Sequence, residues 1–519
     1  MFSSRPKRAR SCGPARATSA RNRLEPEELH GVAPRGIFLG SNLPGKVNPG
    51  SPRPRMGGVE VTIVDKESTA CPVDHGQQSC PAADADLWDF DMFQRQDHHA
   101  VLERLRETDP GIHWVDEGDK GSGYWAITRQ AHLKEVNRRA DVFSSSHSGT
   151  QMRDPDQREW ASGIMNDLTL IDMDAPRHTR YRKLVNRGFT PRMINLLEDY
   201  LQNRTDIILD RVVEAGSCDF VRDISAELPL QAIAEMMGIP VEDRSKVFDW
   251  TNAMVGGEDP DFIKSRDDIL QNAAELFGYS HQLQMERRGT PSDDIVTTLL
   301  SADIDGEALS EIEFDMFFLI LCVAGNETTR NSITRGMMAF FEFGDQWEKF
   351  VADPDRHMET AVEEIVRWAT PVMYFRRQAL ADYEIGGVRI AAGDKVLMWH
   401  VAANRDPRAF EDPWRFDIER TPNDHVGFGG GGPHYCLGAS LARMEIRLMF
   451  REIARRMPDI RLDGEPDYLR SNFIGGVKRL PVAYTPSPSH NTAPLHRLGS
   501  AAGVSGTVGY GGNVERTAS

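Results

Sequence analysis

Cysteine is scarce in this chain, which has six Cys among 519 residues. Disulfide-dependent folds are far richer in cysteine, so a disulfide framework is excluded and a reducing cytoplasm is the expected compartment. Long hydrophobic runs are also missing. The longest, residues 316–325, has about half of the roughly 20 residues that a membrane-spanning helix needs. We therefore expect a cytoplasmic protein without a membrane span.

Two kinds of cofactor motif are absent as well. The chain has no Gly-rich fingerprint of a flavin or dinucleotide domain, and no set of cysteines spaced for an iron–sulfur cluster. Any electrons that the protein uses must therefore come from separate proteins.

Charge is unevenly distributed along the chain. The net charge is −17, yet residues 1–60 contain 11 Lys and Arg against 4 Asp and Glu, or +7, which leaves −24 for the remainder. An acidic body repels nucleic acid and anionic membrane surfaces at long range, whereas the basic arm could touch either weakly. We therefore expect no nucleic-acid partner.

Three regions can be distinguished by composition. Residues 1–85 and 488–519 are rich in Gly and Ser and lack hydrophobic periodicity, which predicts a disordered N-terminal arm and a disordered C-terminal tail. In residues 86–487, apolar residues return every three or four positions, for example over 195–213 and 359–370, which indicates amphipathic helices.

Short runs of β-forming residues interrupt this helical pattern. They lie next to glycines at residues 123–128, 383–390 and 395–399. The sequence therefore predicts small β-sheets beside a mainly α-helical body.

The most informative stretch is residues 427–438, Gly-Phe-Gly-Gly-Gly-Gly-Pro-His-Tyr-Cys-Leu-Gly, which precede a helical run at 439–446. Glycines let the backbone approach a flat ligand closely, and free amides can donate to a sulfur. A helix N-terminus also favours an anion, so we expect Cys436 to be held as a thiolate.

This stretch resembles the haem-binding signature of the cytochrome P450 family, F-x-x-G-x-[HR]-x-C-x-G. Gly432, His434 and Gly438 match it in position relative to Cys436, whereas Phe428 lies one residue further from the cysteine. The resemblance implies that Cys436 is the iron ligand of haem b and that Gly438 belongs to the haem-binding loop. It also implies that the thiolate favours O–O cleavage. The shifted Phe428 leaves open which residue covers the sulfur.

A second motif interrupts an apolar helix. Residues 316–323 lead into Ala-Gly-Asn-Glu-Thr-Thr at 324–329, and polar residues there must serve a site, a water or a bend. The Thr328 hydroxyl can bond a carbonyl one turn earlier, and Gly325 eases the opening of that turn. By the resemblance, Glu327 and Thr328 are the catalytic acid–alcohol pair that relays protons to dioxygen.

A third motif places Glu364 and Arg367 three residues apart on one helical face. Taken alone, such a pair is usually a solvated ion pair. Its order before the cysteine resembles the family's E-x-x-R motif, which implies that both residues lock the core on the cysteine side.

Haem propionates need cations, and four candidates match the family by position. His178 and Arg182 lie one helical turn apart, so both can face one carboxylate. Arg377 and His434 complete the set.

The segments expected to line the substrate pocket carry apolar residues. Such a lining suits a large hydrophobic ligand with few polar anchors. These residues are Val323, Val372, Met373, Phe375, Phe473 and Ile474.

Together, the motifs follow the family's order over residues 87–485 and imply the mainly α cytochrome P450 fold with small β-sheets. They imply a monooxygenase that uses O2 and electrons from NAD(P)H, delivered by a ferredoxin and a ferredoxin reductase. Arg182, Lys183, Arg187 and Arg443 are the expected basic docking residues. A peroxide-driven haem-thiolate enzyme and a non-catalytic haem- or lipid-binding protein are the rival interpretations. Neither needs a pair such as Glu327 and Thr328, which therefore favours the monooxygenase.

The substrate follows from resemblance alone. Residues 293–306, 323–334 and 368–371 look like those of actinobacterial P450s that oxidise the terminus of the sterol side chain. The expected substrate is therefore a sterol such as cholest-4-en-3-one, and the alternatives are a terpenoid or a methyl-branched fatty acid.

Overall fold

The computed structural model describes residues 85–154, 168–186, 189, 191–255, 258–262, 266–291, 294–301, 303–304 and 307–490. Residues 1–84 and 491–519, which make up most of the predicted arm and tail, lie outside these ranges. Ala85 is buried, and the backbone amide of His490 donates to Asp210 over 3.0 Å. The described part therefore includes a few residues on either side of the predicted body, 86–487.

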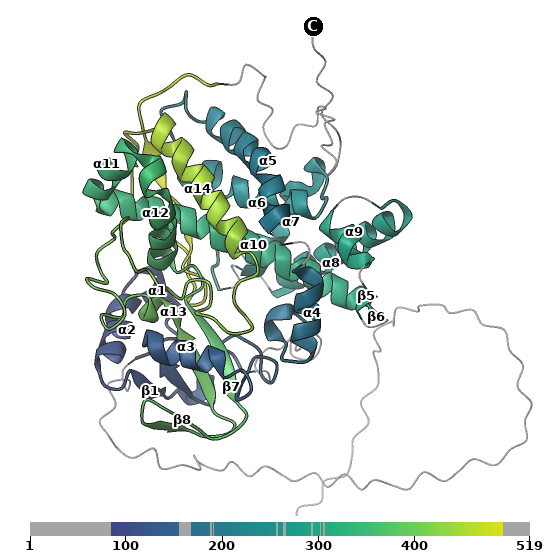
Figure 1. The fold of residues 1–519 in the computed structure, drawn as a ribbon, viewed down its shortest axis with the longest axis vertical. Helices are drawn as coiled ribbons and strands as arrows, with labels where there is room; N and C mark the ends of the chain where they lie inside the picture. The colour runs from purple at the N-terminus through teal and green to yellow at the C-terminus, as the bar shows by residue number, and fades with distance from the viewer. Residues whose placement is uncertain are drawn as a thin grey trace, which may run out of the picture. The chain divides into compact units, whose positions relative to one another are not determined.

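Helices make up most of the described chain, as predicted from the spacing of apolar residues (Figure 1). The α-helices are α1 (Phe90–Gln94), α2 (His98–Glu107), α3 (Gln130–Arg138), α4 (Arg177–Val185), α5 (Pro191–Asp210), α6 (Glu227–Met236), α7 (Arg244–Val255), α8 (Arg266–Gly289), α9 (Ile295–Leu300), α10 (Glu311–Glu342), α11 (Gly344–Ala352), α12 (Pro354–Ala369), α13 (His400–Ala403) and α14 (Ala439–Arg456). The shorter turns are η1 (Gly118–Lys120), η3 (Leu170–Asp172), η4 (Val221–Ser225) and η5 (Val241–Asp243).

The strands are short and lie in small sheets. They are β1 (Ile112–Val115), β2 (Tyr124–Ile127), β3 (Phe143–Ser144), β4 (Ser217–Asp219), β5 (Asp303–Ile304), β6 (Glu307–Ala308), β7 (Tyr374–Ala379), β8 (Tyr383–Ile385), β9 (Val388–Ile390), β10 (Lys395–Trp399), β11 (Arg461–Leu462), β12 (Asp467–Tyr468), β13 (Val477–Arg479) and β14 (Pro481–Ala483).

The largest sheet has the order β1-β2-β10-β7-β3, in which β10 runs parallel to β2 and the other pairs are antiparallel. The strands predicted at 123–128, 383–390 and 395–399 are confirmed as β2, the β8–β9 hairpin and β10. Gly386 and Gly387, at φ +58° and +79°, form the hairpin turn. Both central positions of such a turn need positive φ, which glycine adopts without strain.

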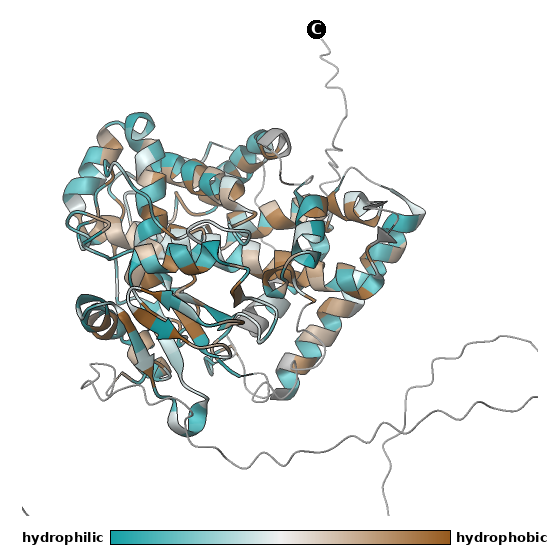
Figure 2. Ribbon diagram, turned by 60° about the horizontal axis from the view of Figure 1, so that its bottom comes forward, coloured by the Kyte–Doolittle hydropathy of each residue, from teal (hydrophilic) through white to brown (hydrophobic). Residues whose placement is uncertain are grey.

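Helix α10 is the central element of the helical body. It contacts α6, α7, α8, α12 and α14, and Figure 1 shows it crossing the middle of the molecule. Its start is fixed by a capping box, in which the Ser310 hydroxyl accepts from the Glu313 amide and the Glu313 carboxylate accepts from the Ser310 amide. Figure 2 shows the outer helices with alternating hydrophilic and hydrophobic residues.

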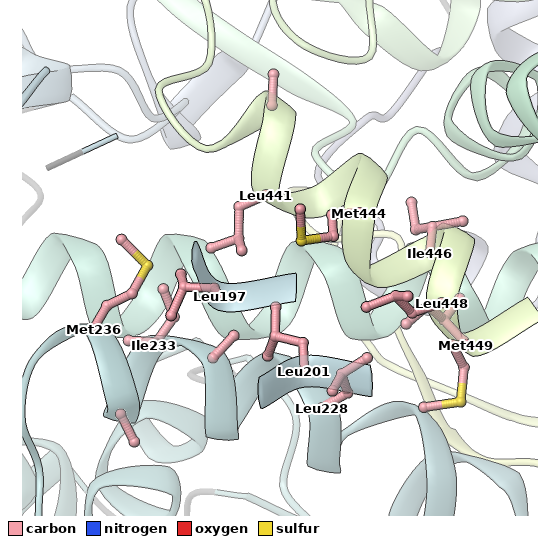
Figure 3. Packing of buried hydrophobic residues seen from close by; sticks show 14 of the residues in the cluster. Leu197, Leu201, Leu228, Ile233, Met236, Leu441, Met444, Ile446, Leu448 and Met449 are labelled. Atoms are coloured by element: carbon pink, nitrogen blue, oxygen red, sulfur yellow. The ribbon is translucent and has the colours of Figure 1, made fainter. Parts of the chain in front are cut away.

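The main hydrophobic core joins α5, α6, α10, α12 and α14. Figure 3 shows Leu201 of α5, Leu228 and Ile233 of α6, and Leu441 and Leu448 of α14 packed together. The packing fixes α14, whose first turn follows Cys436, against the rest of the body. None of the helices in the described part of the chain combines the length and apolarity that crossing a bilayer requires.

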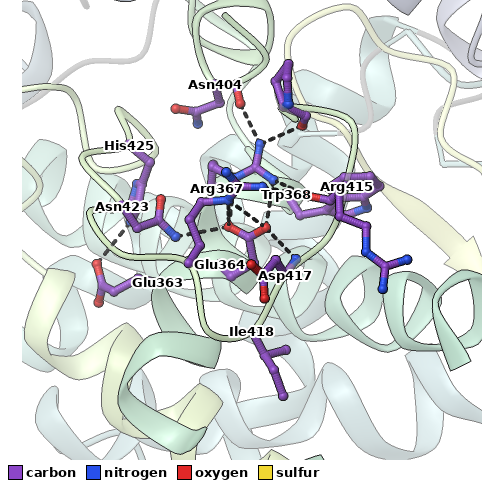
Figure 4. A network of polar contacts seen from close by, with 12 residues as sticks. Glu363, Glu364, Arg367, Trp368, Asn404, Arg415, Asp417, Ile418, Asn423 and His425 are labelled. Atoms are coloured by element: carbon purple, nitrogen blue, oxygen red, sulfur yellow. Dashed lines mark hydrogen bonds and ion pairs between the residues drawn. The ribbon is translucent and has the colours of Figure 1, made fainter. Parts of the chain in front are cut away.

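Helix α12 carries a completely buried ion pair, shown in Figure 4. The Arg367 guanidinium donates from Nε and Nη2 to the two carboxylate oxygens of Glu364, each over 2.7 Å. Its remaining donors reach the backbone carbonyls of Asn404, Pro413 and Arg415. All five guanidinium N–H groups therefore have acceptors.

The Glu364 carboxylate is equally well satisfied. It also accepts from the backbone amide of Asp417 over 2.9 Å, from Arg420 over 3.2 Å and from Asn423 over 3.0 Å. Burial alone would raise the pKa of Glu364, but the Arg367 hydrogen bond and charge outweigh burial, so the pKa is lowered. The pair thus ties α12 to residues 404–423, which lead into the cysteine loop.

Replacing one partner would leave the other charge buried and unpaired. We expect Glu364→Ala to lower the free energy of unfolding at neutral pH by about 3–5 kcal/mol, measured by guanidinium unfolding followed by circular dichroism. Because the folded-state pKa of Glu364 is lowered, its contribution exists above the unfolded pKa of about 4.3 and disappears as pH falls through the folded value. Arg389→Ala, which breaks an exposed pair with Asp382, is the control. Equal destabilisation by both variants would contradict the predicted role.

Candidate functional site

A cavity lies between α10, the start of β7, the first turns of α14 and residues 427–438, which we call the cysteine loop. Helix α10 contributes polar and small residues to its wall, namely Ala324, Gly325, Thr328, Thr329 and Ser332. Cys436 lines the same cavity from the cysteine loop. The structure therefore brings the motif at residues 324–329 and the cysteine loop to one cavity.

The cysteine loop depends on glycine. Gly429, Gly430, Gly431 and Gly432 all have positive φ, from +70° to +104°, which side-chain-bearing residues rarely adopt. A Cβ atom on Gly432 would lie 2.2 Å from the Asn137 carbonyl oxygen. The loop can thus approach α3 this closely only because residue 432 is glycine.

The glycines also explain the shifted position of Phe428. The Cys436 amide donates to the Phe428 carbonyl over 2.9 Å, so the loop closes on itself in spite of its extra residue. Phe428 is buried and lines the cavity. Phe428 therefore lies beside Cys436 although it is one residue further away in sequence.

Two opposing effects act on the Cys436 thiol. Burial raises its pKa, while the backbone amides of Gly438 and Ala439 and the charges of Arg182 and Arg443 lower it, and burial prevails. The amides at the start of α14 thus act in the predicted direction but do not by themselves hold a thiolate. A cation bonded to the sulfur would supply the remaining stabilisation.

The four predicted cations converge at the cavity. His178, Arg182, Arg377 and His434 all line it. The rings of His178 and His434 lie 4.2 Å apart between centroids, and Arg182 donates to the Tyr435 carbonyl over 2.6 Å. Positions far apart in sequence therefore form one basic cluster next to the cysteine loop.

Burial makes the charged forms of this basic cluster unfavourable. Burial lowers the pKa of His434 to about 2, with a further contribution from the charge of Arg377, and burial lowers the pKa of Arg377 to about 10. The Nε2 atom of His178 is buried and has no hydrogen-bond partner among the described residues. Anionic groups would relieve the repulsion and pair the imidazole. A thiol on one side and cations for two carboxylates beside it fit haem b.

On the α10 side, the Thr328 hydroxyl donates to the Ala324 carbonyl over 2.6 Å, as predicted from its place in the helix. A Cβ on Gly325 would lie 2.4 Å from Cδ1 of Ile233 in α6. Glycine is thus needed here for the close approach of α6. Thr328 is half-buried and has its side chain at the cavity wall.

Glu327 has a different environment from Thr328. It is buried, forms an ion pair with Arg330 one turn later, and is not part of the cavity lining. Its Oε1 atom has no partner among the described residues. Burial raises the pKa of Glu327, opposed by the charge of Arg330.

The six predicted substrate-pocket residues divide into two groups. Val372 and Phe375 line the cavity. Phe473 lies behind Phe375, with ring centroids 5.9 Å apart, and its carbonyl accepts from the Met373 amide over 2.9 Å. Ile474 pairs with Val372 in an isolated β-bridge. In this structure Val323, Met373, Phe473 and Ile474 support the wall rather than line it.

Two cavity residues were not anticipated from the sequence. His400 is buried beside the Phe375 ring, and its Nδ1 lies 3.0 Å from the Met398 carbonyl. Glu445 on α14 is buried with its Oε2 atom unpartnered among the described residues, and burial raises its pKa well above the usual value. Glu445 lies in the helical run after the cysteine, between Arg443 and Arg447, and nothing in that stretch of sequence indicates that it would be buried.

The chain is similar to several known proteins. The cytochrome P450 family model matches residues 357–457. A steroid C26-monooxygenase of Mycolicibacterium smegmatis is 49% identical over 391 residues, which cover 74% of this chain and 90% of that protein. A methyl-branched lipid omega-hydroxylase of Mycobacterium tuberculosis is 40% identical over 415 residues, covering 78% and 96%.

A solved structure agrees with these relatives. Mycobacterium marinum cytochrome P450 CYP268A2 in complex with pseudoionone superimposes with a TM-score of 0.70 at 38% identity, covering 76% of this chain and 96% of that one. The fold, the cavity and the relatives lead to the same conclusion. The chain belongs to the cytochrome P450 family and is a haem-containing monooxygenase.

Proposed function

We propose that the protein hydroxylates the side-chain terminus of a sterol at the cavity between α10 and the cysteine loop. The observation that carries the reaction type is the convergence of Cys436, the basic cluster and Thr328 on that one cavity. The steroid C26-monooxygenase of M. smegmatis, at 49% identity, supports the substrate class.

We assign the cofactor contacts to residues of this chain. Cys436 would bind the haem iron through its sulfur, and His178, Arg182, Arg377 and His434 would pair with the propionates. The Gly438 backbone amide is among the groups that would stabilise negative charge on the Cys436 sulfur. When bound, haem supplies the redox chemistry that activates dioxygen.

Replacing Cys436 should remove the iron ligand. We expect Cys436→Ala to abolish the absorption band at about 450 nm that marks a thiolate-ligated ferrous haem with carbon monoxide. Cys322→Ala is the control, since Cys322 of α10 is buried outside the cavity lining and its sulfur lies 3.8 Å from that of Met237 at the end of α6. Persistence of the band in Cys436→Ala would refute the assignment.

Thr328 is proposed as the residue that would donate a proton into the cavity, on the α10 side of the space that the haem would occupy. Its hydroxyl now donates to the Ala324 carbonyl, so it must release this bond to donate into the cavity while keeping an acceptor lone pair for a proton source. Glu327 is the proposed source. Burial raises its pKa, which favours the protonated form, but Glu327 can reach Thr328 only by turning away from Arg330.

Without the Thr328 hydroxyl, the enzyme should still consume NAD(P)H but form less product. We expect Thr328→Ala to lower the product formed per NAD(P)H consumed by about tenfold or more, with the missing electrons recovered as peroxide. Thr334→Val is the control, because the Thr334 hydroxyl donates to the Arg330 carbonyl in the same helix but is absent from the cavity lining. Unchanged coupling in Thr328→Ala would remove its proposed role.

We further propose that electrons pass from NAD(P)H through a ferredoxin reductase and a ferredoxin in the cytoplasm. Of the basic residues expected at the docking surface, Arg187 lies outside the described residues. Arg182 lines the cavity, and Arg443 is paired with Glu363. Lys183, on the exposed side of α4, is the remaining candidate for a ferredoxin contact.

A sterol test distinguishes the substrate classes. We expect cholest-4-en-3-one to shift the haem spectrum towards the high-spin form at micromolar concentration and to be oxidised at a side-chain methyl group. The apolar cavity residues Phe317, Ile320, Val372 and Phe375 support such a ligand. A methyl-branched fatty acid and a terpenoid are assayed in parallel. If they turn over while sterols give neither shift nor product, the assignment passes to the methyl-branched lipid or terpenoid class, the former being that of the M. tuberculosis relative.

A further inference from the structure

We propose that Glu363 is a positioning residue for the cysteine loop, acting through His425 and Arg443 on the segment that binds the Cys436 amide. The inference rests on the proposed role of Cys436. Glu363 precedes the buried Glu364 but faces different partners, and neither the motifs of the sequence nor the cavity lining includes it.

The first branch runs from Glu363 to the start of the loop. His425 Nε2 lies 3.0 Å from Glu363 Oε2, and His425 Nδ1 accepts from the Gly427 amide over 3.1 Å. An Nδ1 that accepts leaves the ring proton on Nε2, so neutral His425 donates to the carboxylate. Glu363 thereby fixes both the tautomer and the ring orientation needed to hold Gly427.

The second branch runs from Glu363 to Phe428. Arg443 on α14 donates from Nε and Nη2 to the two Glu363 oxygens, over 2.5 and 2.9 Å. Its guanidinium carbon lies 4.4 Å from the centre of the Phe428 ring, a favourable cation–π distance. The two-point contact orients the guanidinium, which a single contact would not.

Both branches meet at the cysteine. Phe428 follows Gly427 directly, and the Phe428 carbonyl accepts from the Cys436 amide over 2.9 Å. Gly427 also packs closely on α12, because a Cβ there would lie 2.7 Å from Cγ1 of Val366. Glu363 thus restrains the backbone and the ring of the two residues that position Cys436.

Glu363 can position the loop because its carboxylate is charged and only partly exposed to solvent. Its side chain is 29% exposed and that of Arg443 is 34% exposed, so solvent screens the pair only in part. Partial burial would raise the pKa of Glu363, but the hydrogen bonds from His425 and Arg443 lower it to about 2. The carboxylate therefore stays charged across the pH range in which the enzyme would be assayed.

The test uses the full chain loaded with haem. Wild type and Glu363→Gln are reduced under carbon monoxide in a urea concentration that leaves the far-ultraviolet circular dichroism unchanged. We expect the band at about 450 nm to decay about tenfold faster in Glu363→Gln, since a hydrogen bond to a charged group is lost at each branch. Glu359→Gln removes the same charge from an exposed position one turn earlier in α12 and should match wild type.

Arg443→Lys provides a second variant if Glu363→Gln does not fold. Lysine keeps the charge but not the two-point contact, so the band should again decay faster than in wild type. Equal decay in wild type and Glu363→Gln, or loss of the band only together with the helical signal, would overturn the positioning role alone. Absence of the band from wild type would overturn the assignment of Cys436 as well.

Discussion

The arrangement of the site depends on the buried pair of Glu364 and Arg367. A buried charge is tolerated only when it is paired and hydrogen-bonded, and here every donor of Arg367 has an acceptor. Most of those acceptors are backbone carbonyls of residues 404–415. The pair therefore fixes the path of the backbone and takes no direct part in the reaction. Since residues 404–423 lead directly into the cysteine loop, the position of Cys436 relative to α10 follows from this constraint.

At the cavity the situation is the opposite, because burial there opposes the charged forms of the basic residues. Burial lowers the pKa values of His178, Arg182, Arg377 and His434, and the charges of Arg182 and Arg377 lower those of the two histidines further. Such an arrangement costs stability unless anions are present. The same residues that destabilise the protein alone would therefore bind a dianionic cofactor strongly, and cofactor binding and folding should be coupled.

Much of this could be predicted from the sequence, because local patterns determine it. The strand at 395–399, the hairpin around Gly386, and the cysteine loop before α14 follow from β-forming residues, glycine and helix periodicity. Side-chain direction could not be predicted in the same way. Glu327 and Arg330 have the same spacing as Glu364 and Arg367, and the structure pairs them too, which turns Glu327 away from the cavity. Whether Phe473 lines a wall or supports it depends on strand pairing across the chain.

Two adjacent carboxylates of α12, Glu363 and Glu364, explain how one helix positions the cysteine loop. Successive residues of an α-helix point about 100° apart, so Glu364 faces Arg367, Asp417 and Asn423, while Glu363 faces His425 and Arg443. One helix therefore holds the segment before the loop, the start of the loop and the helix that follows it. Because α12 also packs on α10, a shift of the cysteine relative to Thr328 would require α12 to move as a unit. A fixed separation between these two walls is the condition for placing a flat cofactor and a hydrophobic substrate between them.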